Sequence, residues 1–370
     1  MEFLQKAQEI KDQILGYNSP TKALELYGLC DGKHQTMSQY LESLDPTPLT
    51  DKGEKACPLD AFERHLMVLG LELSGSNAAS VEKLMSTAVY MVPELIKREI
   101  EAGMKASRSN PTGLVASQES VAGLTFHPLY IPNLNLTTTA SRNTKSLGRR
   151  AASGKGGEYP VTRIEHREKD IPVMDYGREI QVAYSVVKSK PWTVFKIFLN
   201  LIGAQMAADE LYDIYQLGHI GDGTVGAATD TFAGVGGTLQ YTDLIRNFTN
   251  FSAPFKMGAI LAPQQSYEAI LTMAQFQDPL SGWEFQKNGT PVTPMGAKLY
   301  QVETVPAGAA VGTEIVTLDP AYAIALASDD QGVFIETEKI ISKQFEKAVV
   351  SNKKVYSVIA DGALKQILWT

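Results

Sequence analysis

One long periodic segment, residues 191–217, constrains the fold more than any other part of the chain. Its apolar residues recur at spacings of three and four, which predicts a helix of about seven turns that Gly218 ends. At ~1.5 Å per residue this helix would be roughly 40 Å long, more than the width of a small domain. The face expected to be buried carries Phe195, Phe198, Leu199, Ile202, Met206 and Leu211. An aspartate at Phe198 or Ile202 is therefore expected to prevent folding, because a buried unpaired charge is costly.

The composition excludes several classes of protein. The 370 residues are 44% hydrophobic and 20% charged, which is typical of a globular chain of two or three domains. A formal charge of −7 leaves no basic surplus for a dedicated nucleic-acid-binding protein. Two cysteines, Cys30 and Cys57, make neither a disulfide framework nor a zinc site. The start of the chain lacks the apolar core of a signal peptide, and no stretch predicts a spanning helix, so we expect synthesis in a cytoplasm and no membrane association.

Residues 1–106 predict an N-terminal helical region. Helices are expected over residues 3–15, 20–29, 59–73 and 79–104, the last of them kinked at Pro93. The polar residues 37–54 are expected to form a linker, because Asp-Pro and Lys-Gly breakers follow one another there. Charged residues of the helices, Arg64 among them, are expected to lie in solvent.

Residues 107–187 predict extended structure. Residues 107–153 form an arm with a basic, Ser- and Gly-rich loop, and residues 154–187 form two strands joined by the charged block 166–170. A two-stranded arm is only marginally stable alone, so it should lie on another surface. Charged residues of these two segments are candidates for contacts between subunits: Arg142, Lys145, Arg149, Arg150, Arg163, Arg167, Lys169, Arg178 and Glu179. The simpler interpretation is that their charges are solvated.

A glycine pattern follows the long helix. Residues 221–226 (GDGTVG) match the dinucleotide-binding pattern, and Asp243 lies at the distance of a ribose-binding acid. The context does not fit, because in such sites the glycines follow a strand and open a helix. The pattern is therefore more typical of a loop.

The C-terminal part alternates helices with strands, which predicts an α+β fold. Strands are expected at residues 255–263, 297–302, 314–318, 322–327, 332–337 and 355–359, and helices at 239–251, 264–274 and 338–348.

No catalytic arrangement emerges from the sequence. The five histidines have no partners at metal-ligand spacing, and the acidic residues Asp209, Glu210 and Asp213 are expected to be solvated on the long helix. Nucleophile-elbow, P-loop and zinc-protease motifs are absent from the sequence. We expect no catalytic, cofactor-binding or metal-binding residues, and a structural protein rather than an enzyme.

The order of elements closely resembles the major capsid proteins of tailed phages, the Hong Kong 97-type fold. The resemblance covers residues 116–370. It depends on an arm that ends in DYGREIQV (residues 175–182), a long helix with IGAQMAADEL (202–211), and the later segments ILAP (260–263), DPAYAIAL (319–326) and KVYSV (354–358).

The resemblance implies a division of the chain and a set of partners. It implies an N-terminal helical region or scaffold-like arm (1–106), an extended N-arm with the basic loop (107–153) and an extended β-hairpin loop (154–187). The spine helix of a peripheral domain (188–222), an axial domain (223–311) and the peripheral strands and C-terminus (312–370) follow. It also implies self-assembly as hexamers and pentamers into an icosahedral virion shell around double-stranded DNA, made in a bacterial host. Scaffolding, portal and decoration proteins are the implied partners.

Two other interpretations stay open. The first is an encapsulin-like cellular nanocompartment, which would form a smaller particle without DNA. The second is a nucleotide-dependent enzyme that uses residues 221–226, which would bind a cofactor and form a small oligomer.

Overall fold

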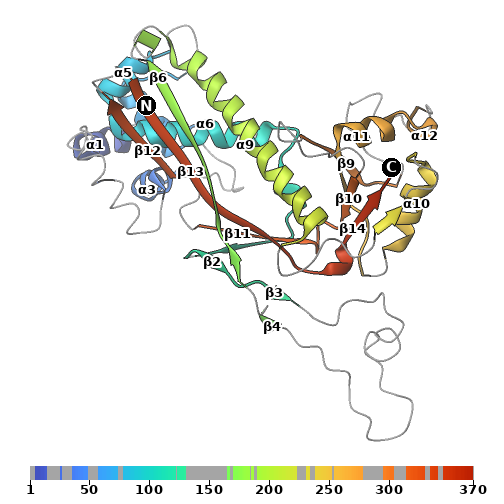
Figure 1. Cartoon of the computed structure of the whole chain (residues 1–370). Helices are drawn as coiled ribbons and strands as arrows, with labels where there is room; N and C mark the ends of the chain where they lie inside the picture. Colours follow the sequence, from blue (N-terminus) through green and yellow to red (C-terminus); the bar gives the residue numbers. More distant parts are fainter. Residues whose placement is uncertain are drawn as a thin grey trace, which may run out of the picture. The chain divides into compact units, whose positions relative to one another are not determined.

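The computed structural model divides the chain into two compact units. It describes residues 5–14, 26, 36–48, 57–73, 78–121, 123–130, 165–166, 170–183, 185–186, 190–222, 231–233, 238–251, 254–277, 295–303, 314–329, 334–340 and 345–369. The first unit comprises Met1–Lys105, Asp175–Ala204 and Asp329–Lys353, and the second comprises Ala106–Met174, Gln205–Ser328 and Lys354–Thr370. Helix α9 (Trp192–Ile220) and strand β13 (Phe345–Val358) have residues in both units (Figure 1). The mixture of helices and strands confirms the α+β class.

The N-terminal part of the first unit is helical, as the sequence predicted. Its helices are α1 (Gln5–Ile14), α3 (Met37–Leu44), α4 (Ala61–Val68), α5 (Val81–Thr87) and α6 (Val92–Ala106). The expected linker at residues 37–54 is wrong in its first part, because α3 lies there. A capping box starts this helix: Thr36 accepts from the amide of Gln39, and the Gln39 side chain accepts from the amide of Thr36.

The predicted helix at residues 79–104 is interrupted rather than kinked. Helix α5 ends at Thr87, a short 3₁₀ turn (Val89–Met91) follows Ala88, and α6 starts at Val92. Pro93 therefore occupies the first turn of α6, where its missing N–H costs no hydrogen bond.

Arg64 is buried rather than solvated. Only 1% of it is exposed, and its guanidinium lies 2.9 Å from the Asp45 carboxylate. It also donates to the backbone oxygens of Asp45 and Leu59, at 2.6 and 2.9 Å. This set of bonds ties α4 to the end of α3, because the fork-shaped guanidinium bonds several acceptors at once.

Helices α6 and α9 approach each other so closely that two glycines are required. A Cβ atom at Gly103 would lie 2.2 Å from the backbone oxygen of Asn200, and one at Gly203 would lie 2.1 Å from that of Ile100. An ion pair of 2.9 Å between Lys196 and Glu99 lies beside this crossing. The backbone contact fixes which face of α9 is covered within the first unit.

The covered face of α9 differs from the predicted one at Phe198. Trp192 and Leu199 are buried, but Phe198 is 58% exposed. The expectation that an aspartate at Phe198 prevents folding by burying a charge is therefore wrong. A regular spacing identifies a helix but not which of two apolar faces the chain covers.

The end of α9 also differs from expectation. The helix continues through Gly218, where a Cβ would lie 2.3 Å from a methyl group of Val316, and ends at Gly221, whose φ is 93°. Gly218 thus serves close packing, and Gly221 supplies the left-handed residue that ends many helices.

A five-stranded sheet contains β13. Its order is β1-β11-β13-β12, where β1 is Ser117–Ser120 and β11 is Ile324–Ser328, and β6 (Met174–Ala183) also pairs with β13. Strand β12 (Phe334–Ile340) is antiparallel to β13, with Ile340 opposite Phe345. The helix predicted at residues 338–348 is therefore wrong, since its described residues belong to these two strands. Pairing along the ladder overrides a local pattern that also fits a helix.

The second unit is built around another five-stranded sheet, of order β7-β14-β10-β8-β9. Its predicted strands are confirmed as β8 (Ala259–Pro263), β9 (Lys298–Val302) and β10 (Glu314–Leu318), as is β11 (Ile324–Ser328) of the other sheet. Every residue of β8 is buried. The helices α10 (Tyr241–Asn250) and α11 (Gln264–Leu271) confirm two predicted helices. Strands β7 (Thr231–Ala233) and β14 (Leu364–Leu368) were not predicted.

Replacing Gly203 with alanine is expected to destabilise the first unit by roughly 1–3 kcal/mol. Alanine favours a helix by about 1 kcal/mol over glycine, but its methyl group would meet a backbone oxygen that cannot rotate away. Chemical denaturation followed by circular dichroism measures the difference. Gly123→Ala is the control, since nothing lies within 4 Å of its Cβ position. An unchanged or higher stability of Gly203→Ala would contradict the close crossing.

Candidate interaction surface

Strand β6 presents an unusually exposed surface. It has ten residues, and none of them is buried. One edge pairs with β13, and among the residues that the structure describes no strand pairs with its other edge (Figure 1). A strand of this length is about 33 Å long. Monomeric proteins avoid long exposed edges because the free N–H and C=O groups pair with other chains.

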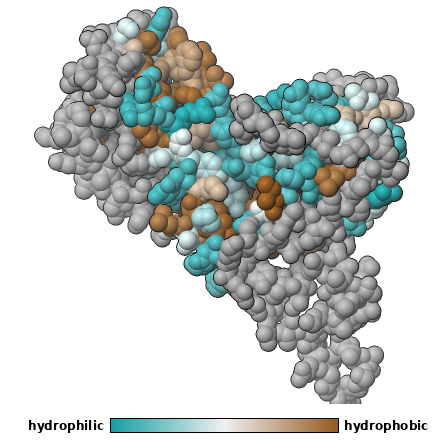
Figure 2. Space-filling model, viewed as in Figure 1, coloured by the Kyte–Doolittle hydropathy of each residue, from teal (hydrophilic) through white to brown (hydrophobic). Residues whose placement is uncertain are grey.

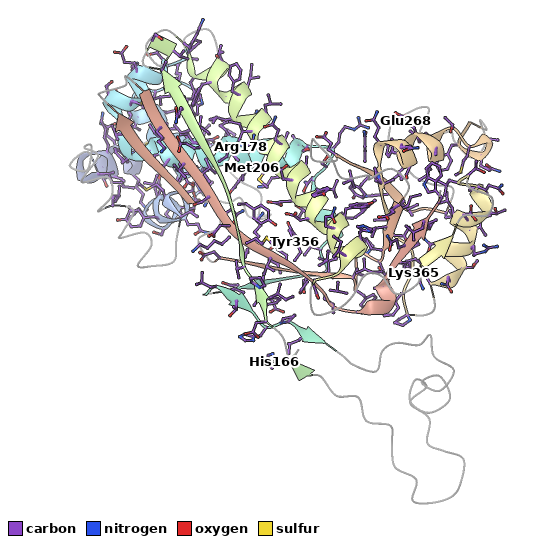
Figure 3. All side chains as sticks on the ribbon, in the orientation of Figure 1. His166, Arg178, Met206, Glu268, Tyr356 and Lys365 are labelled. Atoms are coloured by element: carbon purple, nitrogen blue, oxygen red, sulfur yellow. The ribbon has the colours of Figure 1, made fainter. Side chains whose placement is uncertain are left out.

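The two candidate contact residues on β6 are both exposed. Arg178 projects from the middle of the strand (Figure 3). Glu179 forms an ion pair of 2.6 Å with Lys347 of β13, and this hydrogen bond, together with one from Gln181, lowers the pKa of its carboxyl group. The Glu179 carboxylate is thus engaged within its own chain, and Arg178 is an exposed residue beside it in sequence.

The other candidate contact residues lie outside the described part of the chain. They are Arg142, Lys145, Arg149, Arg150, Arg163, Arg167 and Lys169. The described strands nearest to them are β4 (Glu165–His166) and β5 (Ile171–Pro172), which pair with β3 (Leu129–Tyr130) and β2 (Thr125–Phe126). Strands β4 and β5 thus have partners outside the segment 154–187, and so does β6, which pairs with β13. Residues 154–164, where the first strand of the hairpin is expected, lie outside the described residues.

The candidate nucleotide loop does not have the geometry of a dinucleotide site in its described part. Gly221 ends a helix instead of following a strand, and the Asp222 carboxylate accepts from the amide of Val358 at 3.1 Å. Asp243, the candidate ribose-binding acid, is 2% exposed and accepts from the amide of Gln240 at 3.0 Å as part of the cap of α10. Residues 223–226 lie outside the described residues.

The described histidines do not lie together, and three of them each contact a different residue. His127 contacts Asp170 at 2.6 Å, and His219 contacts Glu314 at 2.5 Å. His65 is buried, and its Nε2 atom lies 2.8 Å from the Tyr90 hydroxyl group. Within the described ranges no group of three His, Cys, Asp or Glu residues could hold a metal ion.

Glu210 is buried in an ion pair and not solvated, which corrects the expectation for this residue. Its carboxylate accepts from Lys354 at 2.7 Å and from the Tyr356 hydroxyl group at 3.1 Å, and 4% of the residue is exposed. The pair joins the second half of α9 to β13. No local sequence pattern indicates this ion pair, because the two residues are 144 positions apart.

Removing one member of this pair should destabilise the second unit. We expect Lys354→Met to cost roughly 3 kcal/mol, because it leaves a buried carboxylate without its cation. The double variant Lys354→Met/Glu210→Gln should recover part of that loss, since a neutral amide still accepts from Tyr356. Urea unfolding of the four members of the double-mutant cycle measures the coupling. Additive losses would contradict a direct interaction.

The first unit should lose stability in acid because of His65. Burial lowers the pKa of this imidazole from 6.5 to about 4, while the unfolded chain keeps the ordinary pKa. Between pH 6.5 and 4 the unfolded state binds more protons, so the free energy of unfolding falls as the pH falls through this window, by at most roughly 3 kcal/mol.

Denaturant melts at pH 7, 5.5 and 4 measure this loss. His65→Gln is the matched variant, because its neutral amide can still bond to Tyr90 but cannot be protonated. The acid-dependent loss should be smaller in that variant, and an equal loss in both proteins would contradict a role for His65.

Comparisons with known proteins identify similar folds only. No family model matches the chain, and no curated protein matches it. A solved structure described as the capsid of an empty GTA particle is 12% identical, with a TM-score of 0.49, and the match covers 72% of this chain and 91% of that one. A structure from Microbacterium phage Oxtober96 is 11% identical, with a TM-score of 0.46 and coverages of 70% and 90%.

A third similar structure is the holo-SrpI encapsulin complex from Synechococcus elongatus. It is 12% identical, with a TM-score of 0.44, and the match covers 68% of this chain and 84% of that one.

The described helices were also compared with the requirements for crossing a membrane. None of them, α9 included, is both long and apolar enough to span one.

Proposed function

We propose that this protein is a structural subunit that assembles with copies of itself into a closed shell of the Hong Kong 97 type. The observation that carries the proposal is β6, whose ten residues are all at least partly exposed and with whose outer edge no described strand pairs. In a monomer such an edge promotes unwanted pairing with other chains. In an assembly a neighbouring chain pairs with it and covers it.

The chemistry of the described residues agrees with a structural role. The polar groups that sequence analysis considered for catalysis or cofactor binding are engaged in structural bonds: Asp243 in a helix cap, Glu210 in an ion pair and His65 with Tyr90. The proposed function therefore includes no catalytic step.

The finer form of the proposal is the head of a tailed phage. The shell would be the virion container of double-stranded DNA, built from hexamers and pentamers, with scaffolding, portal and decoration proteins as partners and synthesis in the bacterial host. A net charge of −7 suits a container that must not adhere to the packaged DNA. Residues 188–222 and 312–370 would form its peripheral domain, and residues 223–311 its axial domain.

Electron microscopy and light scattering of the protein expressed alone, and with its neighbouring genes, test the assembly. Closed particles or sheets of hexamers are expected. Particle diameter and DNA content distinguish a phage head from a cellular nanocompartment, the alternative form of the same shell. A monodisperse monomer or dimer under both conditions would contradict the proposal.

A charge change on β6 tests the surface itself. Arg178→Glu should lower the assembled fraction at least about tenfold, because a reversed charge in a contact costs several kcal/mol. The fold should persist, since Arg178 is exposed. Arg178→Lys keeps the charge and is the matched control. Normal particles from Arg178→Glu would show that β6 does not form the subunit contact.

A further inference from the structure

The last turn of α9 lies against strands β10 and β14 of the second unit (Figure 1). Two contacts hold its backbone in place. A Cβ atom at Gly218 would lie 2.3 Å from a methyl group of Val316, and the Tyr215 hydroxyl group donates to the backbone oxygen of Glu314 at 3.4 Å. Because these contacts fix the backbone, only the side chains at this point can change partners.

His219 has two partners at one ring nitrogen. Its Nδ1 atom lies 2.5 Å from the Glu314 carboxylate of β10 and 2.9 Å from the side-chain nitrogen of Gln366 in β14. The contact with the carboxylate needs a proton on Nδ1, because an ionised carboxylate only accepts. The contact with the amide nitrogen needs a lone pair on Nδ1, because that nitrogen only donates. One atom cannot meet both requirements at once, so the two bonds exclude each other.

Burial decides which bond forms when the ring is neutral. Gln366 is 3% exposed, so an amide N–H that loses its acceptor there is costly. Glu314 can turn toward water instead, because 22% of its side chain is exposed. Figure 2 shows hydrophilic residues over much of the described surface of this unit. The neutral ring of His219 should therefore carry its proton on Nε2 and accept from Gln366 at Nδ1.

A second proton on the ring reverses this arrangement. Both nitrogens of an imidazolium donate, so Nδ1–H then bonds to the Glu314 carboxylate in a charge-assisted hydrogen bond. The Gln366 amide must turn its oxygen toward the ring, since its N–H groups would otherwise meet another donor. An amide turns about its last side-chain bond between two equivalent orientations, so this change needs no movement of the backbone.

The charged and titratable groups described around the ring have partners of their own. Tyr215 stacks on the ring, with centroids 6.2 Å apart, and burial raises the pKa of its hydroxyl group, which stays protonated. Lys365 of β14 directs its ammonium group over the ring of Phe251. The Asp222 carboxylate, which follows α9, accepts from the amide of Val358. Strand β7, which pairs with β14, contains no titratable residue.

We propose that His219, Glu314 and Gln366 form a pH-dependent switch, which bonds the end of α9 to β14 when the ring is neutral and to β10 when the ring is protonated. The proton comes from the solvent, so the switch needs no other reactant. Histidine is the residue whose ordinary titration falls in the physiological range. Protonation also neutralises a surface charge, because a free carboxylate becomes one half of an ion pair. The proposal does not depend on shell formation.

Nuclear magnetic resonance of the full-length chain tests the switch. Histidine rings and glutamine side-chain amides carry isotope labels, the signals are assigned through the backbone, and the sample is titrated from about pH 8 to about pH 5. The unassembled fraction is measured in solution, and sedimented particles are measured in the solid state if the chain only assembles. We expect neutral His219 to carry its proton on Nε2, which the shifts of the two ring nitrogens report. The Gln366 amide signal should follow the same titration curve as the ring.

Variants separate the roles of the two partners. Gln366→Met removes the amide, so neutral His219 should move its proton to Nδ1 and bond to Glu314, which changes the ratio of the two tautomers at least about fivefold. Gln301→Met makes the same substitution in β9 of the same sheet and should leave that ratio unchanged. Glu314→Gln should also leave the neutral ring protonated on Nε2, because Gln366 determines the tautomer.

Four results would overturn the proposal. They are a proton on Nδ1 of the neutral ring, a ring that takes up no proton over the titration, a Gln366 amide signal that stays constant while the ring titrates, and equal effects of Gln366→Met and Gln301→Met on the tautomers. The first three are measured on the unaltered chain, so they remain decisive if a variant does not fold.

Discussion

The first unit depends on the contact between the backbones of α6 and α9. Gly103 and Gly203 leave no side chain between the two helices, so each backbone lies against the other. Dispersion forces increase steeply as atoms approach contact, and a glycine pair permits the closest approach that two helices can make. With one face of α9 held in this way, the rotation of the helix about its axis is fixed, and Ile197 and Phe198 must point outward. The exposure of these two residues is thus a consequence of the glycine contact.

Sequence patterns predicted the elements well where periodicity is determined locally. The long helix, strands β8 to β11 and helices α10 and α11 all followed from spacing alone, because buried faces repeat every 2 or about 3.6 residues. The predictions failed where a residue or strand distant in sequence determines the local structure. Residues 338–340 and 345–348 became strand by pairing in the β12–β13 ladder, and Phe198 became exposed because α6 covers the other face of its helix.

Buried charges were the second kind of feature that the sequence did not reveal. Arg64 and Glu210 each have the residue type and spacing of a solvated helix face, yet each is buried with a counter-ion from another segment. Asp45 lies 19 residues from Arg64, and Lys354 lies 144 residues from Glu210. Most candidate contact residues, Arg142 to Lys169, lie outside the described residues, so the proposal of an interaction surface rests on β6.

Strand β13 has a mechanical consequence. One strand of 14 residues pairs with β12 through residues 345–351 and with β11 through residues 354–358. A force along its axis loads the bonds of each ladder in shear, so that several must break together, whereas a force across the strand would open them one at a time. The hydrogen bonds to β12 and to β11 lie along two successive segments of one continuous strand. Tension applied at one end of β13 is therefore distributed over both ladders. A chain built in this way resists stretching along β13 far better than peeling at its edge.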